Sequence, residues 1–478
     1  MRRSDRSGRA ISFGALAGAL VLSGCAMLPE RGDLPSLVSP DSLASASSLA
    51  APQADWPSDR WWADYGDPQL SGLIEEGLAG AADLRIAQAR FQRAEAMVRQ
   101  SRSRLLPALN ASAESGATKQ SYNFLIPGDV LPQDWPDYGQ AALRLDWELD
   151  FWGKNRSALA AARSDSAAAG AEAAAARLAV SSGIAQAYAD LAALYAEHDA
   201  LSDAVRIRGR TFDLMVRRKA QGLENDGAVE RARSALATTQ GDLAGLDEML
   251  ALTRNRIAVL LGAGPDRGAA ISRPAALVDM AFGLPANLPA DLIGRRPDII
   301  AARLRSEAAA SRITQARAAY YPNINLAGLI GLQALGVENV FKSGSEFGTV
   351  GPAITLPIFD GGRLDGGYRA SEADYRAAVA QYDGALAQAL RDVADATASD
   401  RALGRRLEHG LEAERAATAA WTVANNRYRG GLATYLDVLA AEDALVSARR
   451  AVAVLKTRAF ALDVALVRAL GGGFRSEG

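Results

Sequence analysis

The sequence is poor in the residue types on which metal centres and nucleophilic catalysis depend. Its 478 residues include one cysteine, Cys25, and two histidines, His198 and His409. A single cysteine excludes a disulfide within the chain. Each histidine falls in a stretch predicted to form a long helix, and no further ligands at suitable spacing accompany it. The sequence therefore predicts neither a zinc site nor a Ser-His-Asp triad.

Other classes of functional site lack their signals as well. The glycine pairs at 361–362 and 430–431 are not followed by the Lys-Ser/Thr pair of a phosphate-binding loop. The net charge is −2, and no basic stripe with interleaved aromatic residues points to nucleic acid. Carboxylate pairs such as Asp392 and Asp395 are typical of a solvated helix face. We therefore expect no enzymatic activity, no cofactor, no metal ion and no nucleic-acid partner.

Long apolar runs are absent except for one near the N-terminus, from Ile11 to Leu22. Four arginines precede it, and Leu22-Ser23-Gly24-Cys25 ends it. This pattern is typical of a secretory signal and is too short for a stable transmembrane helix. Small residues before a cysteine resemble the lipobox of bacterial lipoproteins, so we expect Cys25 to be lipidated. An ordinary cleavage site with an incidental cysteine is the alternative.

The chain nearly repeats itself. A shift of 215 residues aligns Asp83 with Asp298, and a shift of 209 aligns Gly222 with Gly431. Each copy is about two hundred residues long, far longer than a solenoid repeat, so the sequence predicts a duplicated half-protein whose halves form similar walls around a common axis. The predicted parts are a lipoprotein signal peptide at 1–24, a lipidated tether at 25–65, repeats at 66–262 and 289–470, a linker at 263–288 and a tail at 471–478.

Two stretches in each repeat are predicted to form β-strands. From Leu143 to Phe151, apolar residues alternate with a set of charged residues on one face, namely Arg144, Asp146, Glu148 and Asp150. The second repeat alternates at 323–326 and 354–358. Such strands, with aromatic residues gathered nearby, are typical of a transmembrane β-barrel, and a soluble two-layer sheet is the alternative. Four strands cannot close a membrane barrel, so a barrel requires several copies of the chain.

Long helices are predicted on either side of these strands. Helical patterns run from Asp67 to Leu106 and from Asp291 to Tyr321, and a proline ends each of them. No proline interrupts residues 157–221. Apolar and small residues then recur in steps of three and four over 229–260 and 438–469, which is the heptad pattern of coiled coils. We therefore expect a mainly α-helical protein in which alanine allows close helix packing.

Taken together, these motifs resemble the TolC/OprM-type outer-membrane factors, in particular the lipidated, NodT-like branch of resistance-nodulation-division (RND) efflux systems. The resemblance implies a trimer that closes a twelve-stranded transmembrane β-barrel, continuous with a twelve-helix α-barrel in the periplasm. The charged strand residues would then face the lumen of the barrel. The motifs that carry the resemblance are Leu22-Ser23-Gly24-Cys25, Trp61-Trp62, Asp67-Pro68-Gln69-Leu70, Leu288-Pro289-Ala290-Asp291-Leu292, Arg295-Arg296-Pro297-Asp298-Ile299, Ala319-Tyr320-Tyr321-Pro322, Pro357-Ile358-Phe359-Asp360-Gly361-Gly362-Arg363, Arg427-Tyr428-Arg429-Gly430-Gly431-Leu432 and Tyr435-Leu436-Asp437-Val438-Leu439.

The resemblance also implies which residues contact a partner. In this family the sharp turns between the long helices lie at the periplasmic tip, where an adaptor protein docks. These turns map onto Gly222 and Leu223 in the first repeat and onto Gly431 and Leu432 in the second. Glycine independently suits such a turn, because a helix that reverses direction commonly ends in a left-handed cap.

The closed end of the family's channel maps onto Tyr428, Leu436 and Asp437. Three copies of Asp437 around an axis would form a constriction that attracts cations. An ordinary solvated helix residue is the alternative for this aspartate. The sequence departs from the family at Ala440, where an Asp is often found, and at Ala433, where some members have an Arg.

The functional prediction is a passive outer-membrane exit channel of a tripartite efflux pump. The expected partners are two further copies of the chain, a periplasmic adaptor protein, an inner-membrane RND pump and outer-membrane lipid. Alanine at position 26 favours the outer membrane, because an aspartate there commonly signals retention in the inner membrane. The duct of a type I protein secretion system is one alternative. A periplasmic adaptor lipoprotein is another, although an adaptor has no reason for duplication of the whole chain.

Overall fold

The computed structural model describes residues 30, 32–121, 129–130, 132, 134–275 and 282–475. These residues divide into two compact units. The first unit contains the described residues up to Leu37 together with Phe91–Ala168 and Ala302–Gln381. The second contains Val38–Arg90 and the described parts of 169–301 and 382–478. Among the described residues, no helix combines the length and hydropathy that a membrane span requires.

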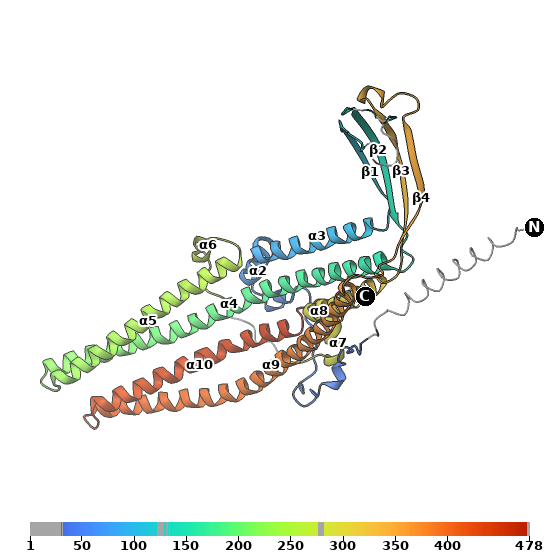
Figure 1. Ribbon diagram of the computed structural model, residues 1–478. Helices are drawn as coiled ribbons and strands as arrows, with labels where there is room; N and C mark the ends of the chain where they lie inside the picture. The colour runs from blue at the N-terminus through green and yellow to red at the C-terminus, as the bar shows by residue number, and fades with distance from the viewer. Residues whose placement is uncertain are drawn as a thin grey trace, which may run out of the picture. The chain divides into compact units, whose positions relative to one another are not determined.

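The order of the elements repeats along the chain, and equivalent helices have equal lengths (Figure 1). Helices α3 and α8 have 22 residues each, α4 and α9 have 67 each, and α5 and α10 have 35 each. The predicted duplication therefore extends to the elements themselves. The helices are α2 Pro68–Gly80, α3 Ala82–Ser103, α4 Lys154–Ala220, α5 Asp226–Leu260, α6 Pro265–Ala269, α7 Leu288–Arg295, α8 Pro297–Ala318, α9 Arg363–Arg429 and α10 Tyr435–Ala469. Short 3₁₀ turns lie at η2 Pro40–Ser42, η3 Trp61–Tyr65 and η4 Val337–Asn339.

The first unit contains one antiparallel sheet with the strand order β1-β2-β3-β4. Its strands are β1 Ala108–Ala117, β2 Asp137–Glu148, β3 Asn323–Leu335 and β4 Glu346–Thr355. The register places Leu143 opposite Ile330 and Leu145 opposite Gly328, and Gly328 opposite Val350. Because side chains alternate along a strand, this register gathers apolar residues on one face of the sheet and most polar residues on the other.

The predicted strands are too long at the ends where they meet the helices. Strand β2 ends at Glu148, and Asp150 lies beyond it, where its carboxylate accepts hydrogen bonds from the backbone N–H groups of Asn155 (3.0 Å) and Arg156 (2.8 Å). A similar arrangement follows β4, which ends at Thr355: Asp360 accepts hydrogen bonds from the backbone N–H groups of Gly362, just before α9, and of Leu364 in its first turn. In both repeats an aspartate satisfies the free N–H groups of a helix that starts within a few residues of the strand, so the strand stops early.

The predicted continuous helices that precede the strands are each broken in two. Residues 67–106 form α2 and α3, which are separated at Ala81. Asp67 is not helical but caps α2, and its carboxylate also accepts from the hydroxyl of Tyr188 at 2.7 Å. In the second repeat Arg296 separates α7 from α8. Pro297 explains that break, because a residue before proline is disfavoured in the helical conformation.

The core of the second unit combines aromatic residues of the N-terminal segment with the faces of the long helices. Trp61 packs edge-on against both Trp62 and Tyr65, and Tyr65 packs against Phe460 of α10 at 4.7 Å between ring centroids. Every residue of the two predicted heptad stripes on α5 and α10 is buried or half-buried. The predicted helix packing is therefore confirmed.

Candidate functional site: the helix turns and the polar face of the sheet

Two turns connect the long helices in the second unit, and they have the same geometry. Gly222 and Gly431 have φ angles of 72° and 76°, which is the left-handed conformation that favours glycine. The N–H of Leu223 donates to the carbonyl of Arg218 at 2.9 Å, and the N–H of Leu432 donates to the carbonyl of Arg427 at 2.8 Å. These bonds define the Schellman motif, which satisfies the last carbonyls of a helix. The predicted glycine caps are thus present in both repeats.

The turns expose apolar side chains. Leu223 is 59% exposed and Leu432 is 73% exposed. A Cβ atom added to Gly222 or Gly431 would have no other atom within 4 Å, so both turns end in open space. An exposed leucine beside a rigid glycine turn is suited to contact with another protein, because its burial there releases water from apolar surface.

The predicted gate residue Tyr428 lies inside the second unit and joins the two helical hairpins. Its side chain is 2% exposed, and its hydroxyl donates to Glu224 at 2.5 Å. The guanidinium of Arg218 lies 4.6 Å from the ring centroid. Burial raises the pKa of this hydroxyl, and the hydrogen bond to Glu224 raises it further. Tyr428 on α9 therefore holds the turn that follows α4.

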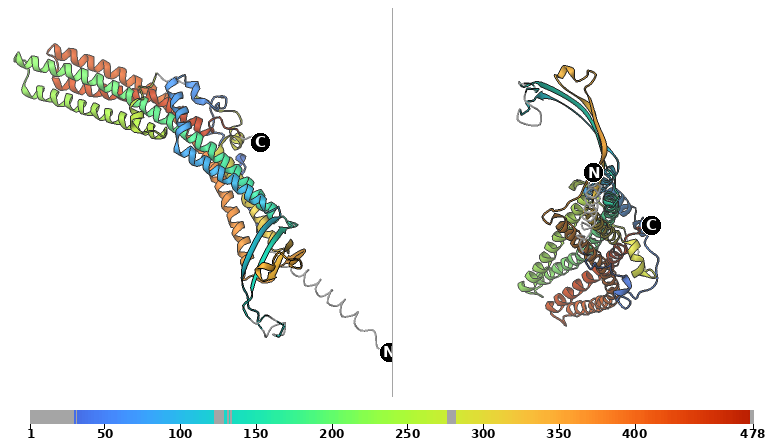
Figure 2. Two further views of the ribbon diagram at one scale, coloured as in Figure 1. Left: turned by 90° about the horizontal axis from the view of Figure 1, so that it is seen from above. Right: turned by 45° about the vertical axis from the view of Figure 1, so that its right-hand side comes forward.

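Apolar side chains surround Tyr428 and complete the contact between the hairpins, which lie side by side in Figure 2. The ring of Tyr428 packs against that of Tyr435 at 6.3 Å between centroids. Burial raises the pKa of Tyr435 to about 12, so it is neutral throughout the physiological range. The buried members of this cluster are Met215, Ala228, Val229, Ala232, Tyr428, Tyr435 and Val438.

The other two predicted gate residues lie on the surface of the second unit. Leu436 is 54% exposed. Asp437 accepts hydrogen bonds from the backbone N–H and the hydroxyl of Thr434, both at 2.8 Å, and so caps the start of α10. These bonds hold the pKa of Asp437 below its usual range, which keeps it ionised. Its carboxylate also lines a groove of about 450 Å³ between α9 and α10, together with Ala419, Ala420, Val423, Ala424, Arg427 and Ala433.

One carboxylate near the turns was not predicted. Glu442 of α10 is only 1% exposed, and its Oε1 accepts hydrogen bonds from Thr211 (2.7 Å) and Trp421 (3.3 Å). Its Oε2 is buried and has no partner among the described residues. Burial raises the pKa of Glu442, although these two hydrogen bonds and the nearby Arg208 oppose that rise. A charged residue four positions after Val438, on the apolar stripe of a helix, was the available signal.

The predicted lumen residues belong to the sheet of the first unit. Arg144, Asp146 and Glu148 occupy alternate positions of β2 and therefore share one face. Glu148 pairs with Lys154 at 2.6 Å. Glu114 of β1 lies on the same face, opposite Gln140, and was not predicted. Asp150 is not part of this face, because it follows the strand and caps α4.

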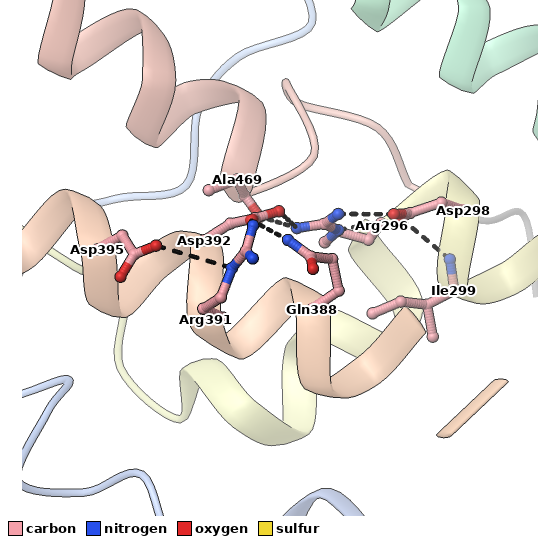
Figure 3. A network of polar contacts seen from close by, with 8 residues as sticks. All are labelled: Arg296, Asp298, Ile299, Gln388, Arg391, Asp392, Asp395 and Ala469. Atoms are coloured by element: carbon pink, nitrogen blue, oxygen red, sulfur yellow. Dashed lines mark hydrogen bonds and ion pairs between the residues drawn. The ribbon is translucent and has the colours of Figure 1, made fainter. Parts of the chain in front are cut away.

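A network around Arg296 holds the junction between α7 and α8 in the second unit (Figure 3). Its guanidinium donates to both carboxylate oxygens of Asp298, at 3.0 and 2.6 Å, and to Asp392 of α9 at 3.1 Å. It also donates to the backbone carbonyl of Ala469, the last residue of α10, at 3.2 Å. The planar guanidinium suits this role because it offers several donors in fixed directions. One side chain thus joins three helices.

No group of three potential metal ligands lies together among the residues that the structure describes. Cys25, the predicted lipidation site, lies outside the described residues. His198 and His409 both lie within the long helices, in α4 and α9 respectively.

The chain is similar to known outer-membrane proteins. Residues 73–263 and 288–472 match the family described as "Outer membrane efflux protein". The chain is 33% identical to the fusaric acid resistance protein FusA of Burkholderia cepacia over 362 residues, which cover 74% of this chain and 68% of FusA. It is 29% identical to the multidrug resistance outer membrane protein MdtP of Escherichia coli K12 over 475 residues, which cover 96% of both chains.

Solved structures show the same fold. The outer membrane protein VceC of Vibrio cholerae is 44% identical, with a TM-score of 0.83 over 88% of this chain and all of VceC. An outer membrane channel of Campylobacter jejuni, CmeC, matches with a TM-score of 0.85 at 21% identity, over 94% of this chain and 96% of that one. The family and these folds are those of channel proteins rather than enzymes. The chain therefore belongs to the outer membrane efflux protein family.

Proposed function

We propose that three copies of the chain form a passive exit channel that carries small toxic compounds across the outer membrane. In this assembly the apolar face of the sheet contacts lipid. The polar face, with Glu114, Arg144, Asp146 and Glu148, lines a water-filled lumen. Cys25 carries the acyl anchor.

The sheet carries this proposal. Its two outer strands have free backbone groups, and in hydrocarbon such groups are tolerated only where another strand satisfies them. Each of the four strands contributes 10 to 13 residues, which is the length that tilted transmembrane strands require. Three copies supply twelve strands, enough to close a barrel without free edges.

The turns of the second unit are the proposed contact with a periplasmic adaptor. Leu223 and Leu432 offer exposed apolar side chains on rigid glycine turns, which suits docking. The hydrogen bond from Tyr428 to Glu224 ties one hairpin to the turn of the other. We infer that this bond favours the closed state, and that an adaptor opens the channel by displacing it.

Leu436 and Asp437 complete the proposed gate. Both lie in the first turn of α10 and are accessible, and three copies of Asp437 around an axis would favour cations there. In this proposal an inner-membrane pump supplies the energy for transport. The names of FusA and MdtP support antimicrobial compounds as cargo.

Sedimentation and conductance of the purified protein test this function. Protein extracted from outer membranes in detergent should sediment as a trimer and should form pores in planar bilayers. Deletion of the gene should raise the sensitivity of the cell to the exported compounds, and the intact gene should restore resistance. A stable membrane-inserted monomer, or trimers that conduct no ions, would overturn the proposal.

A further inference from the structure

The two outer strands of the sheet are matched in length and in exposure. Strands β1 and β4 have ten residues each. Nine residues of β1 and eight of β4 are exposed, whereas most residues of β2 and β3 are at least partly covered. Two strands of equal length with free edges are suited to pair with each other in a ring of identical chains.

The hydrogen bonds of the sheet show which backbone groups face the free edges. Thr118 directly follows β1, and its backbone N–H donates to the carbonyl of Pro136 at 2.9 Å. Because bonding alternates along an antiparallel strand, the backbone groups of even-numbered residues of β1 bond to β2, and those of odd-numbered residues face the free edge. Ser345 directly precedes β4, and its carbonyl accepts from the backbone N–H of Gln333 in β3 at 2.8 Å. The backbone groups of even-numbered residues of β4 therefore face the other free edge. An odd-numbered residue of β1 must therefore pair with an even-numbered residue of β4.

We propose, on the basis of the trimer proposed above, one specific register between neighbouring copies. Strand β1 of one copy pairs antiparallel with β4 of the next so that Ala108 lies opposite Thr355 and Ala117 lies opposite Glu346. In the middle of the interface Ser112 then faces Gly351. Each residue number on β1 and its partner on β4 add to the same total, as in any antiparallel ladder.

We choose this register because it lets the two strands overlap completely. In the proposed register all ten residues of β1 lie opposite all ten residues of β4. The parity rule allows slips only in steps of two residues, and each such slip leaves two residues of each strand without a partner. Unpaired backbone groups are disfavoured in a membrane, so the register without overhang is preferred.

The side chains agree with this pairing. Leu109 and Ile354, which are 65% and 67% exposed in the single chain, lie directly opposite each other on the apolar face. Val350, which is 78% exposed, lies opposite Ala113. Pro352 faces Ala111 and leaves that carbonyl without one donor, which is the single missing bond in the ladder.

The inclination of the strands is consistent with the same register. The strand pairing leads across the sheet from Ala108 to Asp146, Ala327 and Gly351, which lies four residues from the end of β4. Each copy thus shifts the register by four residues, and three copies shift it by twelve. With strands about 4.8 Å apart and a rise of about 3.3 Å per residue, the tilt is about 35°, within the range of known barrels. The two alternative slips give about 19° and about 46°.

Cysteine cross-linking between copies tests the register. The variant Ser112→Cys is combined in turn with Gly351→Cys, Ala353→Cys and Thr349→Cys, which represent the proposed register and the two slips. All four positions lie on the polar face, and space is open beside Gly351. Within one chain these positions are at opposite edges of the sheet, too far apart for a disulfide, so any cross-link joins two copies. Cys25 is unchanged, and the single variants control for it.

Outer membranes containing each variant are treated with a mild oxidant and examined on non-reducing gels, and each variant is also sedimented. We expect covalent dimers and trimers with Ser112→Cys and Gly351→Cys, and far weaker bands with the other two pairs. Stronger bands with Ala353→Cys or Thr349→Cys would overturn the register and leave the trimer intact. Trimers without cross-links in any pair would overturn the pairing of β1 with β4. A monomer in sedimentation would instead refute the proposed function.

Discussion

Replacement of Glu442 by glutamine tests whether a buried carboxyl controls the stability of the helices near the turns. Glu442 is 1% exposed, and its Oε2 is buried without a partner among the described residues. The charged groups near it are Arg208 on α4 and Asp443 on α10. Thr211 and Trp421 donate hydrogen bonds to its carboxylate. Glutamine has the shape of the protonated carboxyl but cannot ionise.

The sign of the pH effect follows from the raised pKa. Burial raises the pKa of Glu442 in the folded protein, whereas an unfolded chain has a glutamate pKa of about 4.3. The folded state therefore binds this proton more tightly. The stabilisation is fully present below about pH 4.3 and is lost as the pH rises through the folded pKa. An unsatisfied buried group costs about 1–3 kcal/mol, so this is the expected gain of Glu442→Gln at high pH.

Hydrogen exchange of α10 measures this effect. At pH 8 the amides around position 442 should exchange about 5- to 150-fold more slowly in Glu442→Gln than in the native trimer, and the two proteins should converge at pH 4.5. Comparison at each pH cancels the intrinsic dependence of exchange on pH. The control is Glu230→Gln on α5, because Glu230 is exposed and its ion pair with Arg233 lies at the surface.

Two results would refute the reasoning. If Glu442→Gln and the native trimer differ by the same factor at pH 4.5 and pH 8, the carboxyl does not titrate in this range. If the native helix becomes more protected relative to the variant as the pH rises, the ionised form is the stable one, and the assigned sign is wrong.

Two further predictions concern the turns. Tyr428→Phe removes the hydrogen bond to the half-buried Glu224, so we expect it to destabilise the closed state by about 1–2 kcal/mol and to increase the single-channel conductance. The control is Tyr435→Phe, because the hydroxyl of Tyr435 forms no hydrogen bond to another described residue. That variant should conduct as the native channel does. Equal conductance of the two variants would remove Tyr428 from the gate. Gly222→Trp combined with Gly431→Trp should abolish drug resistance, because the bulky side chains block adaptor docking. The matching alanine variants introduce the same backbone strain of about 1 kcal/mol per residue but should retain resistance. Resistance that survives both tryptophans would exclude these turns as the docking surface.

The sequence predicted the elements well wherever a long period was present. The heptad stripes of α5 and α10 are buried or half-buried as expected, because a pattern sustained over many turns outweighs local exceptions. The predicted ends of the strands were wrong. Asp150 alternates correctly with apolar residues, yet it caps the following helix, and in the second repeat Asp360 caps α9 only a few residues after β4 ends. Alternation alone does not distinguish a strand residue from a capping residue that follows it.

The contacts of the candidate site were less accessible to sequence reasoning. The glycine turns were predictable, since a helix that must reverse uses a residue with positive φ. The bond between Tyr428 and Glu224 joins residues 204 positions apart, and no local pattern specifies such a pair. The position of Glu442 beside the apolar stripe of α10 was a signal for its burial, but its hydrogen-bond partners on α4 and α9 could not be identified from the sequence.

The two repeats have diverged where their helices join, although the helix lengths are equal. The repeat shifts place Arg296 over Ala81 and Asp392 over Gly183, so the first repeat lacks the charged network that ends α10. There the buried Ala81 and Ile184 belong to an apolar core instead. Charged networks are not generally more stable than apolar packing, but a guanidinium at a helix C-terminus does hold the last carbonyl in a fixed direction. The duplication therefore accounts for the similar hairpins, whereas different interactions hold the helix junctions of the two repeats: an apolar core at Ala81 and a charged network at Arg296.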